Sequence, residues 1–372
     1  MSNFVFSADG HVVEPRGLLM DGLPESLRGY GIRSEKRDDY MVTLSGNTVI
    51  NRIRLNRPPP VLKEGEDSFG RSNRLGASNI EGRLIDMEHE GIDAEIVFPS
   101  SGLWTFLIEN PDAELATNQI YNDWNNGFFS GHLDRFVRCG ILPVRDFANT
   151  VSEMKRIAAL GFTAAMLPSI VPAGVPGYND AAWDPVFEAG QQLGIVFVLH
   201  TGTGREDVRS VKGPGGAIVN YTIQMCDAQQ SIMAMVGGGV LDRFPGAKVA
   251  VIESGASWLA ALAERMDEVN EAHAQFVQPK LSLPPSEIIR RQVSASFQYD
   301  RACIMSRSVT GHQALLWGAD YPHHEGTFPR SKSVVAHLFD GIDISEREKA
   351  DIIGGNAARL FRLNHPKVAV AA

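Results

Sequence analysis

The sequence predicts an α/β protein built as an eight-stranded (β/α)8 barrel. Short runs rich in β-branched and apolar residues recur along the chain, and several are apolar throughout, which is typical of parallel strands buried on both faces. Between them lie segments whose apolar residues are spaced three and four apart, as in amphipathic helices. A doubly wound open sheet is the alternative, but ADGHVVEP (8–15) lacks the glycine-rich phosphate loop expected after its first strand.

Eight segments have strand character, and their number matches the barrel. These candidate strands are residues 4–9, 92–99, 135–142, 162–168, 195–200, 248–253, 292–297 and 314–320. Helices are predicted over 79–92, 112–133, 149–161 and 181–194, and Gly161 and Gly194 are placed to end two of them. Residues 345–363 predict two C-terminal helices, with Asn356 capping the second.

Residues 15–78 interrupt the alternation of strands and helices. The stretch DDYMVTLSGNTVINRIRL alternates polar and apolar residues around a turn at Ser45-Gly46-Asn47, which predicts a β-hairpin. A proline run at 58–60 belongs to an irregular loop after it. We therefore expect one domain spanning 1–372, with an insertion at about 15–78 over the barrel mouth.

Composition narrows the class of protein. The chain has 372 residues, of which 44% are hydrophobic, and a net charge of -9, which disfavours binding to nucleic acid or to anionic membranes. We see no signal peptide and no apolar run of roughly 20 residues that would span a bilayer. The three cysteines are scattered, which predicts free thiols in a reducing cytoplasm.

Ionisable residues stand at the ends of four candidate strands. Asp9 and His11 end the first, His200 the fifth, Glu253 the sixth and Asp320 the eighth. Barrel enzymes place their chemistry at these carboxyl ends, and residues two apart on a strand face the same side. Carboxylates and imidazoles together suit zinc, manganese or ferrous iron. The coincidence predicts one metal site, made of Asp9, His11, His200 and Asp320.

Several motifs resemble the amidohydrolase superfamily, specifically the amidohydrolase family 2 branch that resembles aminocarboxymuconate-semialdehyde decarboxylase. The resemblance covers most of the chain in the family's order and implies a distorted barrel whose divalent ion is held by the four residues just named. It is carried by ADGHVVEP (8–15), YNDWNNGF (121–128), ILPVRD (141–146), LGFTAAMLP (160–168), DAAWDPVFEAGQQLGIVFVLHTGTG (180–204), RFPGAKVAVIESGASWL (243–259), LLWGADYPHHEGTFPRS (315–331) and GGNAARLFRL (354–363).

Two departures from the superfamily pattern bear on the metal. Asp9 stands where a histidine is usual, and Glu253 stands at the position of the usual strand-6 histidine. Extra carboxylates shift the preference from zinc toward manganese or iron. We expect one ion and leave a second open. Residues considered for a second ion, or for contacts around the first, are Glu253, His273, His323, His324 and Glu14.

The resulting expectation is a metal-dependent hydrolase or non-oxidative decarboxylase for a small carboxylated organic substrate. Asp320 would accept a proton in hydrolysis or donate one in decarboxylation, and His200 would orient the substrate. His323 and His324 are further proton donors to consider. One alternative is a hydroxylase or monooxygenase that activates dioxygen with iron or manganese, and another is a supporting subunit with a structural metal. The resemblance also implies a homo-oligomer, or a hetero-oligomer with a related chain.

Overall fold

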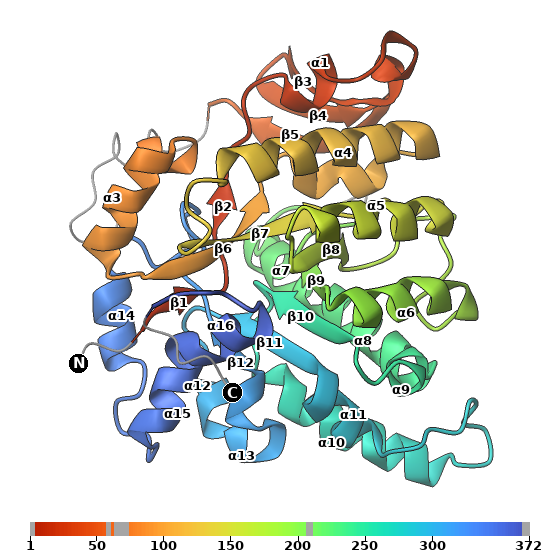
Figure 1. Ribbon diagram of the computed structural model, residues 1–372, viewed down its shortest axis with the longest axis vertical. Helices are drawn as coiled ribbons and strands as arrows, with labels where there is room; N and C mark the ends of the chain where they lie inside the picture. Colours follow the sequence, from red (N-terminus) through yellow and green to blue (C-terminus); the bar gives the residue numbers. More distant parts are fainter. Residues whose placement is uncertain (1–3, 57–60, 63–73, 206–210, 367–372) are drawn as a thin grey trace.

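The computed structural model describes residues 4–56, 61–62, 74–205 and 211–366, so the proline run at 58–60 lies outside the described residues. The predicted parallel barrel is confirmed (Figure 1). Its first strand is split in two, and the last strand returns to it, since the Ala8 amide donates to the Trp317 carbonyl (2.8 Å). In sheet order the strands are β1 (Phe6–Ser7), β6 (Ala94–Pro99), β7 (Phe136–Ile141), β8 (Ala164–Pro168), β9 (Val196–His200), β10 (Lys248–Ile252), β11 (Val293–Phe297) and β12 (Leu315–Trp317), with β2 (His11–Val12) paired to β6.

Helices surround the barrel, as predicted from their apolar spacing. The Asn79 side chain accepts a hydrogen bond from the Gly82 amide at the start of α3, and Gly194 ends α6 with a left-handed φ of 66°. The helices before the C-terminal pair are α1 (Leu18–Asp21), α3 (Ile80–Glu90), α4 (Pro111–Phe128), α5 (Phe147–Ala159), α6 (Asp184–Leu193), α7 (Gly216–Ile223), α8 (Met225–Gly237), α9 (Val240–Arg243), α10 (Trp258–Ala272), α11 (Pro285–Gln292), α12 (Arg301–Met305), α13 (Arg307–Thr310) and α14 (Ser331–His337).

The C-terminal pair, α15 (Glu346–Ala350) and α16 (Asn356–Leu360), is joined by a π-helical turn. The prediction that Asn356 caps the second helix is wrong, because the residue before it is already helical. Instead the Asn356 amide donates to the carbonyls of His312 (2.7 Å) and Leu315 (3.0 Å). This side chain therefore ties the C-terminal helices to the start of β12.

The insertion is a three-stranded antiparallel sheet rather than a hairpin. The predicted hairpin is β4 (Tyr40–Ser45) and β5 (Thr48–Arg54), and β3 (Ile32–Arg37) adds a strand to it. The sequence of β3, IRSEKR, is too polar to stand out as a strand, because three of its six residues are exposed and only Ile32 is buried. A small apolar cluster joins the sheet to the barrel and is formed by Ile32, Ile108 and Ala113, with Leu27 and Trp104 packed against it.

The main core follows the barrel wall. Every residue of β6, β7, β8 and β9 is buried, as expected for strands covered on both faces. In the described part of the chain, the largest fully buried side chains are Trp183 and Trp317, followed by Tyr121 and Tyr178. Among the helices of the described ranges, none is both long and apolar enough to cross a membrane.

One buried carboxylate makes the stability of the fold depend on pH. Glu114, on α4, is fully buried and accepts hydrogen bonds from the amides of Val144 (3.1 Å) and Arg145 (3.1 Å). Burial raises the pKa of Glu114 from 4.5 to about 7, against the lowering effect of these bonds. Between pH 4.5 and 7 the folded protein thus keeps a proton that the unfolded chain has lost, and stability falls as pH rises.

Glu114→Gln removes this titration and is expected to change the pH dependence of unfolding. The free energy of unfolding of the variant, relative to the wild type, should rise by up to about 3 kcal/mol as pH increases through that window. Denaturant titrations at several pH values measure it, with Glu109→Gln, on the exposed surface, as the control. A difference that stays constant with pH would show that the Glu114 carboxyl ionises normally in the folded protein.

Candidate metal centre

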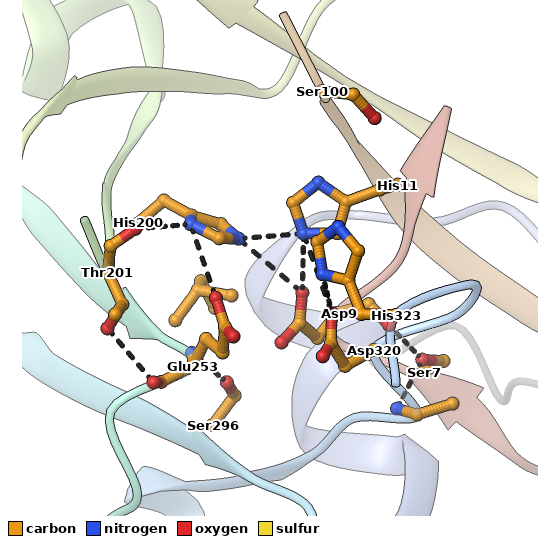
Figure 2. Close-up of polar contacts among 12 residues, drawn as sticks. Ser7, Asp9, His11, Ser100, His200, Thr201, Glu253, Ser296, Asp320 and His323 are labelled. Atoms are coloured by element: carbon orange, nitrogen blue, oxygen red, sulfur yellow. Dashed lines mark hydrogen bonds and ion pairs between the residues drawn. The ribbon is translucent and has the colours of Figure 1, made fainter. Parts of the chain in front are cut away.

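The structure brings Asp9, His11, His200 and Asp320 together at the carboxyl ends of the strands, and all four are fully buried (Figure 2). The His11 Nε2 atom lies 3.1 Å from His200 Nε2, 3.7 Å from Asp9 Oδ1 and 3.6 Å from Asp320 Oδ1. His200 Nε2 lies 3.6 Å from Asp9 Oδ1. Asp9, His11 and His200 thus form one group of potential ligands, and Asp320 adjoins it through His11.

Backbone carbonyls set the orientation of both imidazole rings. The Nδ1 atom of His11 lies 2.8 Å from the Pro99 carbonyl, and Nδ1 of His200 lies 3.0 Å from the Thr201 carbonyl. A carbonyl only accepts, so each Nδ1 carries a proton and each Nε2 is directed into the site. When both rings are neutral, their two Nε2 lone pairs face each other at 3.1 Å beside two carboxylates, an arrangement that a cation between them relieves.

Asp9 supplies a second test of whether the residues fit a cation. Its Oδ1 is buried and accepts no hydrogen bond within the described part of the chain, while Gln298 donates to Oδ2 at 3.4 Å. A buried carboxylate oxygen with no donor is costly unless a positive charge compensates it. Gly318 makes room for Asp9, because a Cβ there would lie 2.6 Å from that of Asp9. These observations fit a divalent ion bound by mixed imidazole and carboxylate ligands.

Glu253 and His323 lie at the edge of the cluster. The Glu253 carboxylate lies 3.8 Å from His200 Nδ1, and His323 Nδ1 lies 2.8 Å from Asp320 Oδ1. The ring of His323 also lies against that of His11, with centroids 4.1 Å apart and the planes tilted by 34° (Figure 2). Glu253 and Asp320 both have left-handed backbone conformations, with φ of 60° and 53°. Such strained residues are often found at functional sites.

Burial and mutual charge shift the pKa values of these groups. Burial lowers the pKa of His11 well below its usual value, and His323 and His200 lower it further, so His11 is neutral and suited to be a ligand. Burial also lowers the pKa of His200, but Asp9 and Glu253 together raise it above the usual value. Burial, followed by the negative charge of Asp320, raises the pKa of Glu253 well above its usual value.

Three other predicted residues lie apart from this cluster. The Glu14 carboxylate accepts hydrogen bonds from the amides of Ser100 (3.1 Å), Ser101 (2.9 Å) and Gly102 (2.9 Å), so it holds the loop after β6. His273 is exposed at the C-terminal end of α10, and His324 is exposed beside His323. Within the described ranges, none of the three belongs to a group of side chains spaced to hold a metal.

Two residues near the site were missed by sequence reasoning. Glu325 groups with Glu253, Asp320 and His323, whose potential ligand atoms all lie within 4.8 Å of one another. Gln298, which contacts Asp9, directly follows β11. The strand-end rule applied to the other strands points to Gln298, but an amide stands out less than a carboxylate or an imidazole.

Comparison with known proteins agrees with this fold. A curated 2-amino-3-carboxymuconate-6-semialdehyde decarboxylase from Dictyostelium discoideum is 25% identical over 293 residues, which are 77% of each protein. Similar solved structures include an amidohydrolase from Mycobacterium avium subsp. paratuberculosis (TM-score 0.80, 19% identity, 97% of this chain and 98% of that one). Another is 5-carboxyvanillate decarboxylase from Sphingomonas paucimobilis (TM-score 0.70, 22% identity, 98% and 100%).

A third structure, a dihydroxybenzoic acid decarboxylase from Polaromonas, contains manganese and the inhibitor 2-nitroresorcinol (TM-score 0.65, 18% identity, 98% of this chain and 99% of that one). At these identities the structural matches establish the barrel fold. The model of the amidohydrolase family matches residues 83–363, about three quarters of the sequence. That match spans β6 to β12 and includes His200, Glu253 and Asp320. The chain therefore belongs to amidohydrolase family 2, the group of metal-dependent enzymes that its motifs resemble.

Proposed function

We propose that this protein is a metal-dependent, non-oxidative decarboxylase of a small carboxylated aromatic or semialdehyde compound. The observation that carries the proposal is the buried group of Asp9, His11 and His200, with buried Asp320 3.6 Å from His11 Nε2. Hydrolysis fits the same four residues. The Dictyostelium relative and two of the similar structures are decarboxylases, which favours decarboxylation instead.

Asp9, His11, His200 and Asp320 would hold the ion, with manganese or iron preferred over zinc because two ligands are carboxylates. When bound, a divalent ion supplies positive charge that fixes and polarises the oxygens of an anionic ligand. His200 keeps its Nε2 directed into the site through the Thr201 carbonyl and so helps to orient the substrate.

In the reaction, the bond between the carboxylate group and the substrate carbon that bears it breaks, and carbon dioxide leaves. The electron pair left on that substrate carbon then takes up a proton. His323 and Asp320 are placed to supply that proton. His323 Nδ1 lies 2.8 Å from Asp320 Oδ1, and the His323 side chain is 33% exposed, whereas Asp320 is fully buried. The pair therefore links solvent to the interior of the site, and a positioned proton donor of this kind contributes roughly 10²- to 10⁴-fold to a rate.

Product analysis tests the reaction directly. Protein loaded with manganese is incubated with hydroxylated benzoates and with carboxylated semialdehydes, and carbon dioxide and the organic product are measured. In deuterated water, we expect one deuterium at the carbon that lost the carboxylate. Hydrolytic cleavage of ester or amide substrates without release of carbon dioxide would instead assign the protein to the hydrolases.

A second candidate function is favoured by the group formed by Glu253, Asp320, His323 and Glu325. These four side chains adjoin the first site through Asp320 and are rich in carboxylates, as suits a second iron or manganese ion. Two ions per chain would favour a hydroxylase that activates dioxygen.

Metal content distinguishes one ion from two. For the decarboxylase we expect one equivalent of manganese or iron in protein purified without added zinc, and the same amount in Glu253→Gln. Two equivalents in the wild type that fall to one in Glu253→Gln would favour the hydroxylase. A single zinc would count against the hydroxylase.

We further propose that the enzyme acts in the cytoplasm and forms an oligomer with itself or with a related chain. Cys139 and Cys303 are buried and free, and Cys226 is exposed and free, which supports a reducing compartment. Size measurement of the purified protein tests the assembly, and co-purification of a related chain would favour the role of a supporting subunit.

A further inference from the structure

A buried ion pair lies behind the candidate metal centre, between α3 and the barrel wall. Arg83, on α3, is 3% exposed, and Glu95, on β6, is 1% exposed. The guanidinium group donates from Nε to Glu95 Oε1 (2.5 Å) and from Nη2 to Glu95 Oε2 (2.9 Å). This two-bond geometry fixes the plane of the guanidinium group. A buried ion pair is weak evidence for stability on its own, so its further contacts decide what it does.

Those contacts reach both segments that carry metal ligands. Arg83 Nη1 donates to the main-chain carbonyl of His11 (2.5 Å). The guanidinium group also lies over the ring of Tyr321, 4.5 Å from its centroid, and Tyr321 directly follows Asp320. The two segments bond to each other, because the His11 amide donates to the Tyr321 carbonyl (2.6 Å). Arg83 thus contacts the backbone of one proposed ligand and the residue next to another.

The surroundings are shaped to admit this side chain. A Cβ on Gly10 would lie 2.8 Å from Arg83 Nη2 and 2.8 Å from Glu95 Oε2, so glycine lets the guanidinium group approach the split first strand. The Tyr321 hydroxyl donates to Asp86, which also pairs with Arg74. Arg83 and Asp86 therefore each have an oppositely charged partner, and Tyr321 is held by Arg83 over its ring and by Asp86 at its hydroxyl.

We propose that Arg83 is a positioning residue that fixes His11 and Asp320 relative to each other and thereby sets the affinity of the metal centre. Arg83 does not touch the converging ligand atoms, since its bonds run to Glu95 and to main-chain carbonyls. It acts through the backbone of His11 and through Tyr321. This inference rests on the proposed metal site, and it concerns how precisely the protein positions His11 and Asp320 for metal binding.

Manganese binding to the metal-free protein tests the inference without an activity assay. Free Mn²⁺ is counted by its electron paramagnetic resonance signal during titration of each variant, and thermal unfolding shows that the variant is folded. Arg83→Met alone leaves Glu95 buried without its partner and can fail to fold. The decisive variant is therefore Arg83→Met combined with Glu95→Gln, which removes both charges together with the donor to the His11 carbonyl.

We expect the double variant to fold and to bind Mn²⁺ at least tenfold more weakly than the wild type. Arg83→Lys keeps the charge and one donor and should weaken binding less. Arg243→Met is the matched control: Arg243 also makes a two-bond pair, with Asp184 (3.0 and 2.5 Å), but on the exposed surface, and its loss should leave the affinity unchanged.

Three outcomes decide between the claims. Wild-type affinity in the folded double variant would overturn the role of Arg83, while loss of binding in His11→Ala would still support the metal site. An equal loss of affinity in Arg243→Met would show that any lost ion pair weakens binding, and it would also overturn the inference. If the wild type binds no Mn²⁺, or binds it as well as His11→Ala does, both the metal site and the role of Arg83 fail.

Discussion

Asp320→Asn is expected to lower the turnover of the enzyme at least 10³-fold while the protein remains folded. Asp320 lies 3.6 Å from the ligand atom of His11 and 2.8 Å from His323, so its charge serves both the ion and the proton path. Loss of a positioned acid or base alone accounts for roughly 10²- to 10⁴-fold. Weaker metal binding adds to that loss, since an amide is a poorer ligand than a carboxylate.

Asparagine is the appropriate replacement because of the backbone at this position. Asp320 has a φ of 53°, a left-handed conformation that asparagine tolerates better than alanine does. The variant therefore tests chemistry with little added strain. Turnover is measured at saturating manganese, with circular dichroism as the check of folding. Asp123→Asn, at an exposed carboxylate on α4, is the control. Activity within tenfold of the wild type would rule out Asp320 as a central residue of the site.

The barrel could be predicted because its strands are apolar throughout and its helices are amphipathic. Both patterns result from burial, and burial is what the sequence records most directly. The strand β3 shows the limit, since IRSEKR is largely exposed and its pairing with β4 comes from backbone hydrogen bonds that leave little trace in residue type. Asn356 shows another limit, because its bonds run to residues 41 and 44 positions away rather than within its own helix.

The proposed ligands could be located because each stands at the end of a run with strand character in the sequence, and parallel strands in a barrel bring their carboxyl ends to one rim. Loop residues have no such rule. Glu14 and His323 both follow strands, yet Glu14 turns to three backbone amides while His323 faces Asp320. The role of Arg83 depends on a contact across 72 positions to a main-chain carbonyl, and a carbonyl carries no mark in the sequence.

The metal-free protein is expected to be less stable than the metal-bound one. Asp9→Asn should reduce this difference, because it lowers the stability gained from metal and raises the stability of the metal-free protein. Binding at 100 times the dissociation constant stabilises a fold by about 2.7 kcal/mol, so a chelator should lower the unfolding temperature of the wild type by several degrees. Asp9→Asn loses a charged ligand and should bind manganese at least tenfold more weakly.

Without metal, however, Asp9→Asn should unfold at a higher temperature than the wild type. In the wild type, Asp9 Oδ1 is buried without a hydrogen bond in the described part of the chain, and it lies 3.7 and 3.6 Å from the Nε2 atoms of His11 and His200. An amide at this position carries no charge, and its NH₂ group can donate to either imidazole. The substitution therefore removes the cost of burying an uncompensated carboxylate, roughly 1–3 kcal/mol. Differential scanning calorimetry with and without chelator measures both effects, and Asp123→Asn should follow the wild type in each. If metal-free Asp9→Asn were less stable than the metal-free wild type, groups of the protein itself would compensate the charge of Asp9. Removing that charge stabilises the metal-free protein only if a bound cation is what normally compensates it.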